Sequence, residues 1–323
     1  MTCKGGNPFQ LVVYKEYGSE SVYMNDTTRN KGLEAQYLLP GGYLGYKIQN
    51  QEIEIIDSSA LLGEARIPER IEGYPVTAIH KKAFLSRKYL QKVTLPETVC
   101  QVGDWAFAHC DRLKEISIGN PRVHLGKAVF LDCKELRFLY LPDKNRTVAA
   151  LFAGAVGLLK TEYLLNPLEA GSEEWFAKWD ARAKELLLSK DESGYSKQVL
   201  CGEEDYGSVD LRAYKERARK KKVRVAFLRL LYPDELRPEL KALLEQYLLT
   251  HTKGCESEET WKVLLEEYGN NSEYYKLFAT LGCLTRENRA AILEDIGEDH
   301  PEMKAYFMGF FGQEGDFFDS LFL

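Results

Sequence analysis

Apolar residues recur at a fixed interval of 23 positions between residues 79 and 141. A period of this length is typical of solenoid proteins, in which one unit buries its apolar side only by stacking on the next. The pattern therefore predicts three stacked repeats over residues 76–143. The apolar columns that share the register are Ile79, Val102 and Leu125; Ala83, Ala106 and Val129; Phe84, Phe107 and Phe130; Leu90, Leu113 and Leu136; Val93, Ile116 and Leu139; Leu95, Ile118 and Leu141.

Each repeat also predicts one short strand, because apolar and polar residues alternate near its end. Val93 and Leu95 point to one face of such a strand and leave Lys92 and Thr94 on the other. The residues one and two periods later take the same outward positions. The predicted outward face therefore consists of Lys92, Thr94, Glu115, Ser117, Phe138 and Tyr140.

Residues 1–75 predict an N-terminal cap, since a solenoid must cover its first apolar edge. We expect a strand over residues 9–17 and a short hairpin over residues 46–56. The joint over residues 67–79 resembles the regular joint over residues 95–102 but is five residues longer. A lengthened joint of this kind indicates a divergent first repeat.

Beyond Asp143 the 23-residue period stops and helical spacing replaces it. The apolar run at 148–159 predicts a buried helix, and Ser172 is a favourable N-cap for the helix that follows. Short connections between the remaining helices predict antiparallel helix pairs. These later helices are expected at residues 211–231, 234–249, 257–268, 272–281, 285–296 and 301–311. The sequence thus predicts an α+β protein, in which a short β-solenoid precedes an all-α domain, with parts at 1–75, 76–143 and 144–323.

The repeat motif resembles a known family. Its pattern Val102-Gly103-x-x-Ala106-Phe107-x-x-Cys110-x-x-Leu113-x-x-Ile116-x-Ile118 is similar to that of BspA-like leucine-rich repeats. The resemblance covers residues 46–143 and departs from the pattern at Arg87 and Val129. It implies a curved β-solenoid that recognises proteins or surface ligands without catalysis, in a protein of bacterial origin. Helical C-terminal extensions accompany such repeats in similar proteins.

Charge and composition limit the classes of partner and the cellular location that we expect for the protein. The net charge of −6 disfavours general binding to nucleic acids or anionic membranes. The N-terminal residues lack the basic and apolar pattern of a secretory signal, and no apolar run is long enough to span a bilayer. The seven cysteines show no paired close spacing. We therefore expect a cytoplasmic protein with no membrane span.

The outward face of the repeat strands is the first candidate site. Exposed aromatic residues beside charged ones, as at Phe138 and Tyr140, are plausible anchors for a protein partner. In the alternative interpretation, the helical domain covers these two residues to cap the last repeat. The leading hypothesis is a non-catalytic protein–protein interaction scaffold that uses the repeat surface and its junction with the helical domain.

A basic run over residues 210–224 is the second candidate site. It has eight Lys or Arg residues against two acidic ones and could bind nucleic acid or another polyanion. The alternative is a solvated helix face, because a helix spreads these residues around its circumference. The candidate anion-binding residues are Arg217, Arg219, Lys220, Lys221, Lys222 and Arg224.

Cysteine and histidine residues predict neither an enzyme nor a metal site. Cys110 and Cys133 occupy one repeat position, so they are either buried core thiols or the two ends of a disulfide. Neither Cys201 nor His300 has a second histidine or cysteine at ligand spacing, and no glycine-rich phosphate loop occurs. We expect no cofactor. The apolar tail at 315–323 either seals the last helices or docks on another chain.

Overall fold

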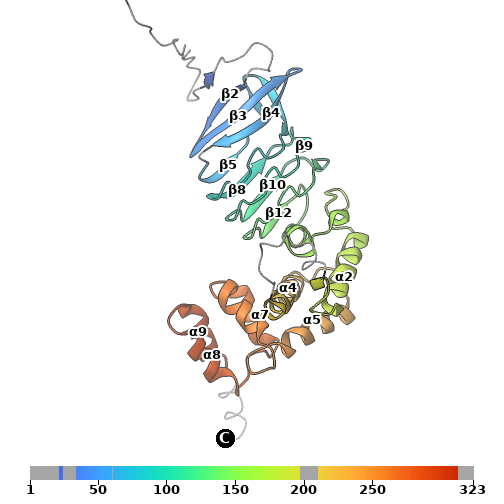
Figure 1. Cartoon of the computed structure of the whole chain (residues 1–323), viewed down its shortest axis with the longest axis vertical. Helices are drawn as coiled ribbons and strands as arrows, with labels where there is room; N and C mark the ends of the chain where they lie inside the picture. The colour runs from blue at the N-terminus through green and yellow to red at the C-terminus, as the bar shows by residue number, and fades with distance from the viewer. Residues whose placement is uncertain (1–21, 25–33, 60, 197–209, 312–323) are drawn as a thin grey trace, which may run out of the picture. The chain divides into compact units, whose positions relative to one another are not determined.

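The computed structural model describes residues 22–24, 34–59, 61–196 and 210–311. They divide into two compact units, Met1–Gly171 and Ser172–Leu323 (Figure 1). The predicted strand at 9–17, Cys201 and the tail at 315–323 lie outside the described residues.

The described strands of the first unit form two sheets. We call the first of them the meander sheet. It begins with four antiparallel strands, β1 (Val22–Met24), β2 (Glu34–Leu39), β3 (Gly42–Gln49) and β4 (Glu52–Ser59). Three parallel strands follow β4 in the same sheet, β7 (Tyr74–Ile79), β9 (Gln101–Val102) and β11 (His124–Leu125). The short strand β6 (Arg70–Ile71) pairs with β7. The repeat sheet is parallel and consists of β5 (Gly63–Arg66), β8 (Leu90–Leu95), β10 (Glu115–Ile118) and β12 (Phe138–Tyr140). These strands lie side by side in Figure 1. The predicted hairpin and β-solenoid are confirmed.

The apolar columns form the core of this unit. Phe84, Phe107 and Phe130 are buried and stack along the solenoid, with ring centroids 4.7 and 5.8 Å apart. Successive turns approach each other so closely that a Cβ on Gly103 would lie 2.5 Å from the backbone nitrogen of Lys81. Glycine is therefore required where one turn crosses the next.

The segment after the last repeat strand belongs to the same unit. The chain forms α1 (Arg146–Gly154), the π-helical turn η1 (Ala155–Leu159) and the 3-10 turn η2 (Glu162–Leu164). The side chain of Asn145 caps α1 by accepting a hydrogen bond from the backbone of Val148. The helix packs on β12 with its apolar side chains buried. The compact unit that holds the solenoid therefore extends to Gly171, because α1 covers the open end of the solenoid, and the expected division near residue 144 stays a prediction.

The second unit is helical. Its elements are α2 (Glu173–Leu188), α4 (Leu211–Leu231), α5 (Pro238–Thr250), α6 (Glu259–Val263) with the π-helical η3 (Leu264–Tyr268), α7 (Ser272–Thr280), α8 (Arg289–Ile296) and α9 (Pro301–Gly309). Ser172 caps α2 as predicted. Three helices begin later than expected: α5 starts at Pro238, α6 at Glu259 and α8 at Arg289. Thr285 and Asn288 hydrogen-bond each other ahead of α8.

The centre of the second unit contains a buried charge. Arg229 of α4 is fully buried and binds the carboxylate of Asp180 in α2, with its Nε 2.6 Å from Oδ1. Its guanidinium also lies over the rings of Phe176 and Trp179. This ion pair and the aromatic side chains join α2 to α4, because leaving the guanidinium unpaired there would be costly.

Candidate protein-interaction surface

The repeat sheet brings all six predicted outward residues together. In the parallel register Lys92 pairs with Glu115, and Glu115 pairs with Phe138. A second column next to it contains Thr94, Ser117 and Tyr140. We call these two columns of side chains, one from Lys92 to Phe138 and the other from Thr94 to Tyr140, the outer columns. The predicted alternation is confirmed, whereas the role of these residues in binding stays a prediction.

Strand β5 extends the outer columns by two residues that sequence analysis missed. Glu64 lies beside Lys92, and Arg66 lies beside Thr94. The signal was the lengthened joint over residues 67–79, which indicated a divergent first repeat but did not fix the register of the strand before it.

Aromatic side chains form the end of the outer columns nearest α1. The rings of Phe138 and Tyr140 stack with centroids 5.6 Å apart, and the guanidinium of Arg146 lies 5.0 Å from the Phe138 ring. Both aromatic side chains are half-buried. Burial, and then the charge of Glu115, raise the pKa of Tyr140. The result is a stacked aromatic pair, accessible in part, at the last turn of the solenoid.

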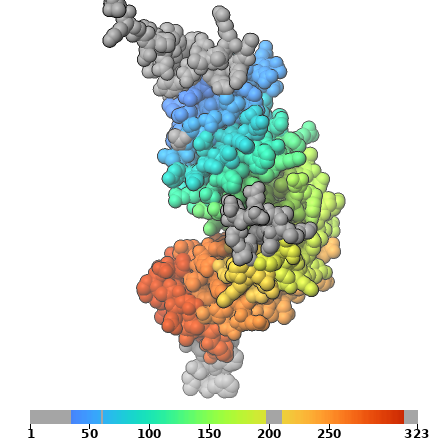
Figure 2. Space-filling model, in the orientation of Figure 1, coloured from blue at the N-terminus to red at the C-terminus, as the bar shows by residue number. Residues whose placement is uncertain are grey.

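Charged and hydroxyl groups occupy the rest of this face. Lys92 and Glu115 form an ion pair of 3.3 Å, and Arg66 binds Glu64 at 2.9 Å. All four side chains are at least partly exposed, so each pair contributes little to stability. The face therefore changes from charged at β5 and β8 to aromatic at β12. Figure 2 shows the surface of this unit in blue to green.

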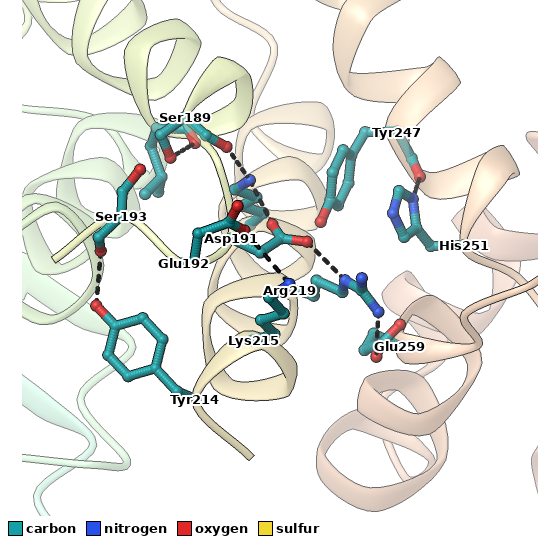
Figure 3. Close-up of polar contacts among 12 residues, drawn as sticks. Ser189, Asp191, Glu192, Ser193, Tyr214, Lys215, Arg219, Tyr247, His251 and Glu259 are labelled. Carbon is teal, nitrogen blue, oxygen red and sulfur yellow. Dashed lines mark hydrogen bonds and ion pairs between the residues drawn. The ribbon is translucent and has the colours of Figure 1, made fainter. Parts of the chain in front are cut away.

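The basic run lies on α4 and binds carboxylates of its own unit (Figure 3). Asp191, which follows α2, accepts hydrogen bonds from Lys222 and Arg219, each at 2.7 Å. Lys222 is buried and also donates to the backbone carbonyl of Ser189. Burial raises the pKa of Asp191, but the hydrogen bonds from Lys222 and Arg219 outweigh it and lower the pKa below its ordinary value.

Two further basic residues of α4 bind the acidic residues of η3. Lys220 lies 2.8 Å from Glu266, and Arg224 binds both oxygens of Glu267, at 2.6 and 2.8 Å. A hydrogen bond from the side chain of Arg224 to Glu267 raises the pKa of the arginine. Of the other candidates, Arg217 is exposed and Lys221 is half-buried. Much of the basic run therefore holds α4 against its neighbours.

The repeats match a known sequence family. The profile described as "BspA type Leucine rich repeat region (6 copies)" matches residues 55–167. These residues are BspA-type leucine-rich repeats. The match extends through α1, η1 and η2, in agreement with the unit that ends at Gly171.

Solved structures of bacterial leucine-rich repeat proteins are also similar to part of this chain. A leucine rich cell surface protein from Faecalibacterium prausnitzii is 27% identical, with 31% of this chain and 29% of that one covered and a TM-score of 0.28. A leucine-rich repeat protein from Bacteroides capillosus is 20% identical, with 33% and 97% covered and a TM-score of 0.27. The chain thus spans under a third of the first of these structures. No curated protein matches it.

Two of the three cysteines in the BspA-type repeats are core thiols, and Cys100 is exposed. Cys110 and Cys133 are buried and free, and each donates a hydrogen bond to a backbone carbonyl of the preceding turn. In the first repeat Arg87 takes this position and binds Ser58 and Asp57 of β4 instead. Arg87, where the sequence departs from the repeat motif, therefore joins the N-terminal cap to the first repeat.

The histidine considered for catalysis has a local partner. The Nδ1 atom of His300 lies 2.9 Å from the side-chain oxygen of Asn270. A groove of about 530 Å³ near Lys253, Cys255 and Asn288 does not include His300. Within the described residues, no three histidine, cysteine or acidic side chains are grouped as metal ligands, and no helix is long and apolar enough to cross a bilayer.

Proposed function

We propose that this chain is a non-catalytic scaffold that binds a protein partner through the outer columns of its BspA-type repeats. The stacked pair of Phe138 and Tyr140 carries the proposal, because rigid, partly accessible aromatic residues are typical anchors of protein interfaces. Repeat solenoids use their extended sheet surfaces for binding in general.

The charges on the same face support a protein partner rather than a polyanion. Lys92 is paired with Glu115 and Arg66 with Glu64, so the outer columns present both signs of charge. Mixed charge beside an aromatic anchor suits the polar rim and apolar centre of a protein interface. The predicted contribution of the helical domain and the cytoplasmic setting stay predictions.

Polyanion binding by α4 is the less favoured role. Lys220, Lys222 and Arg224 each bind a carboxylate of their own unit. A phosphate would have to displace these partners, which would offset much of the gain from its charge.

Affinity capture with paired variants tests the proposed role. The bait with Phe138→Ala and Tyr140→Ala should lose partners that the wild type recovers from a lysate of the native cell. The matched control carries Gln101→Ala and His124→Ala, which are neighbouring exposed residues of the meander sheet. Recovery of the same partners by both variants would contradict the assignment of the face.

A further inference from the structure

Strand β5 ends the repeat sheet, as far as the described residues show. One of its edges pairs with the neighbouring turn, because Gly63 donates to the carbonyl of Tyr89 and Ile67 donates to that of Thr94. Backbone groups alternate in direction along a strand. The amide and carbonyl groups of Glu64 and Arg66 are therefore directed to the other edge, where no described strand pairs with them.

We propose that this edge of β5 pairs antiparallel with the same edge of a second copy of the chain. A two-fold axis through Ala65 would place Glu64 opposite the partner's Arg66, and Arg66 opposite the partner's Glu64. Both are then positions at which antiparallel strands exchange two backbone hydrogen bonds. The edge is complementary to itself in charge and in hydrogen bonding, as a two-fold interface requires.

The side chains around the axis fit this arrangement. Ala65 points into the core and is fully buried, so no bulky group stands at the axis. The side chains of Glu64 and Arg66 are 42% and 78% exposed. They bind each other at 2.9 Å within one copy, and across the axis each would gain a second partner of opposite charge. Opposite charges directly across an antiparallel pair are stabilising.

The chain's own turn and a proline set the length of the paired segment. The backbone N–H of Leu62 points to the same edge but already donates to the carbonyl of Gly41 in the turn after β2. Pro68 has no backbone N–H to donate and ends the pairing beyond Arg66. The pairing is therefore limited to Glu64, Ala65 and Arg66, and Leu62, which is 57% exposed, lies at its end.

Sedimentation velocity of the full chain tests the pairing. The wild type should form a dimer whose population rises with protein concentration in the micromolar range. Glu64→Arg makes the edge wholly positive and Arg66→Glu makes it wholly negative, so that each variant alone should self-associate roughly tenfold more weakly. Glu97→Arg changes the same charge at an exposed site away from the edge and should leave the dimer unchanged.

Mixing the two edge variants gives the decisive result. An equimolar mixture of Glu64→Arg and Arg66→Glu proteins should form dimers as the wild type does, because a positive edge then meets a negative one. Loss of folding in either variant would not produce this recovery. A wild type that stays monomeric, a dimer that neither variant weakens, or a mixture that stays monomeric would each overturn the proposal. A wild-type monomer would leave the proposed partner binding intact, since that binding depends on Phe138 and Tyr140.

Discussion

The thiol of Cys133 donates a hydrogen bond to the backbone carbonyl of Phe107, with Sγ and O 3.1 Å apart. One turn earlier, Cys110 does the same to Phe84 at the same distance. The repeat therefore conserves a polar contact between turns as well as its apolar columns. Both thiols serve packing, since free cysteine behaves as a small buried apolar residue with a weak donor.

The two thiols should react slowly in the folded protein, because both are buried and the reagent cannot reach their Sγ atoms. The neighbouring Cys110, together with burial, raises the pKa of Cys133, whereas the neighbouring Cys133 lowers the pKa of Cys110, so burial rather than thiolate formation carries this expectation. Brief treatment with iodoacetamide near pH 8 should modify the exposed Cys100 and leave Cys110 and Cys133 unmodified, as read by peptide mass spectrometry. Denaturant should expose both to the reagent. A peptide that links Cys110 to Cys133 under non-reducing conditions would contradict this account.

The contact between turns at Gly103 predicts a large loss of stability on substitution. Gly103→Ala would force a methyl group to 2.5 Å from the Lys81 nitrogen, so neighbouring turns would have to separate. Overpacking of this kind costs about 3 kcal/mol in the free energy of unfolding. The control is Gly157→Ala, because nothing lies within 4 Å of the added methyl group. Equal midpoints for the two variants in urea unfolding would contradict the close approach.

Sequence reasoning predicted the repeats because their apolar columns recur without gaps, and each column then packs against itself. It missed a second regularity. Trp105 and His109 adopt left-handed backbone conformations, with φ of 54° and 58°, and the residues one turn earlier, Lys82 and Ser86, do the same. None of these four positions is a glycine, so the sequence does not indicate that the backbone turns there. Stacking between turns imposes the conformation.

The basic helix shows a different limit of sequence reasoning. The run of charges suggested a solvated face or a polyanion site, whereas Lys220 and Arg224 bind Glu266 and Glu267, more than 40 positions later. Local charge counts do not identify partners from distant helices. The aromatic pair at Phe138 and Tyr140 was predictable, since its spacing and register follow directly from the repeat.

Removal of the buried ammonium at Lys222 should destabilise the helical unit in a pH-dependent way. Lys222→Met leaves Asp191 without one of its two hydrogen-bonding cations and should lower the free energy of unfolding by about 2 kcal/mol at pH 7. The control Lys241→Met removes an exposed ion pair on α5 and should change stability by less than about 0.5 kcal/mol.

The pH dependence follows from the lowered pKa of Asp191. A carboxylate whose pKa is depressed in the folded state stabilises the fold above its unfolded value of 3.8, and this contribution is lost as the pH falls through the folded pKa. The difference between wild type and Lys222→Met should therefore shrink below pH 3.8. A constant difference from neutral to acidic pH in urea unfolding would contradict the role of the pair.

Salt dependence should distinguish the two binding roles. If α4 bound nucleic acid, its affinity would fall steeply with added salt. Binding releases the counterions condensed on each phosphate that the protein neutralises, and added salt opposes this release. The internal ion pairs instead predict negligible retention of single- or double-stranded nucleic acid at low salt, measured by fluorescence anisotropy. Tight binding that is abolished by Arg217→Ala with Lys221→Ala would favour the polyanion role.

The affinity of a purified partner for the outer columns tests the central claim most directly. Titration calorimetry would compare the wild type with the Phe138→Ala, Tyr140→Ala variant and the Gln101→Ala, His124→Ala control. Loss of an aromatic anchor pair should weaken binding by roughly a hundredfold, while the control keeps the wild-type dissociation constant. Equal dissociation constants for the wild type and the Phe138→Ala, Tyr140→Ala variant would contradict the claim that this face binds the partner.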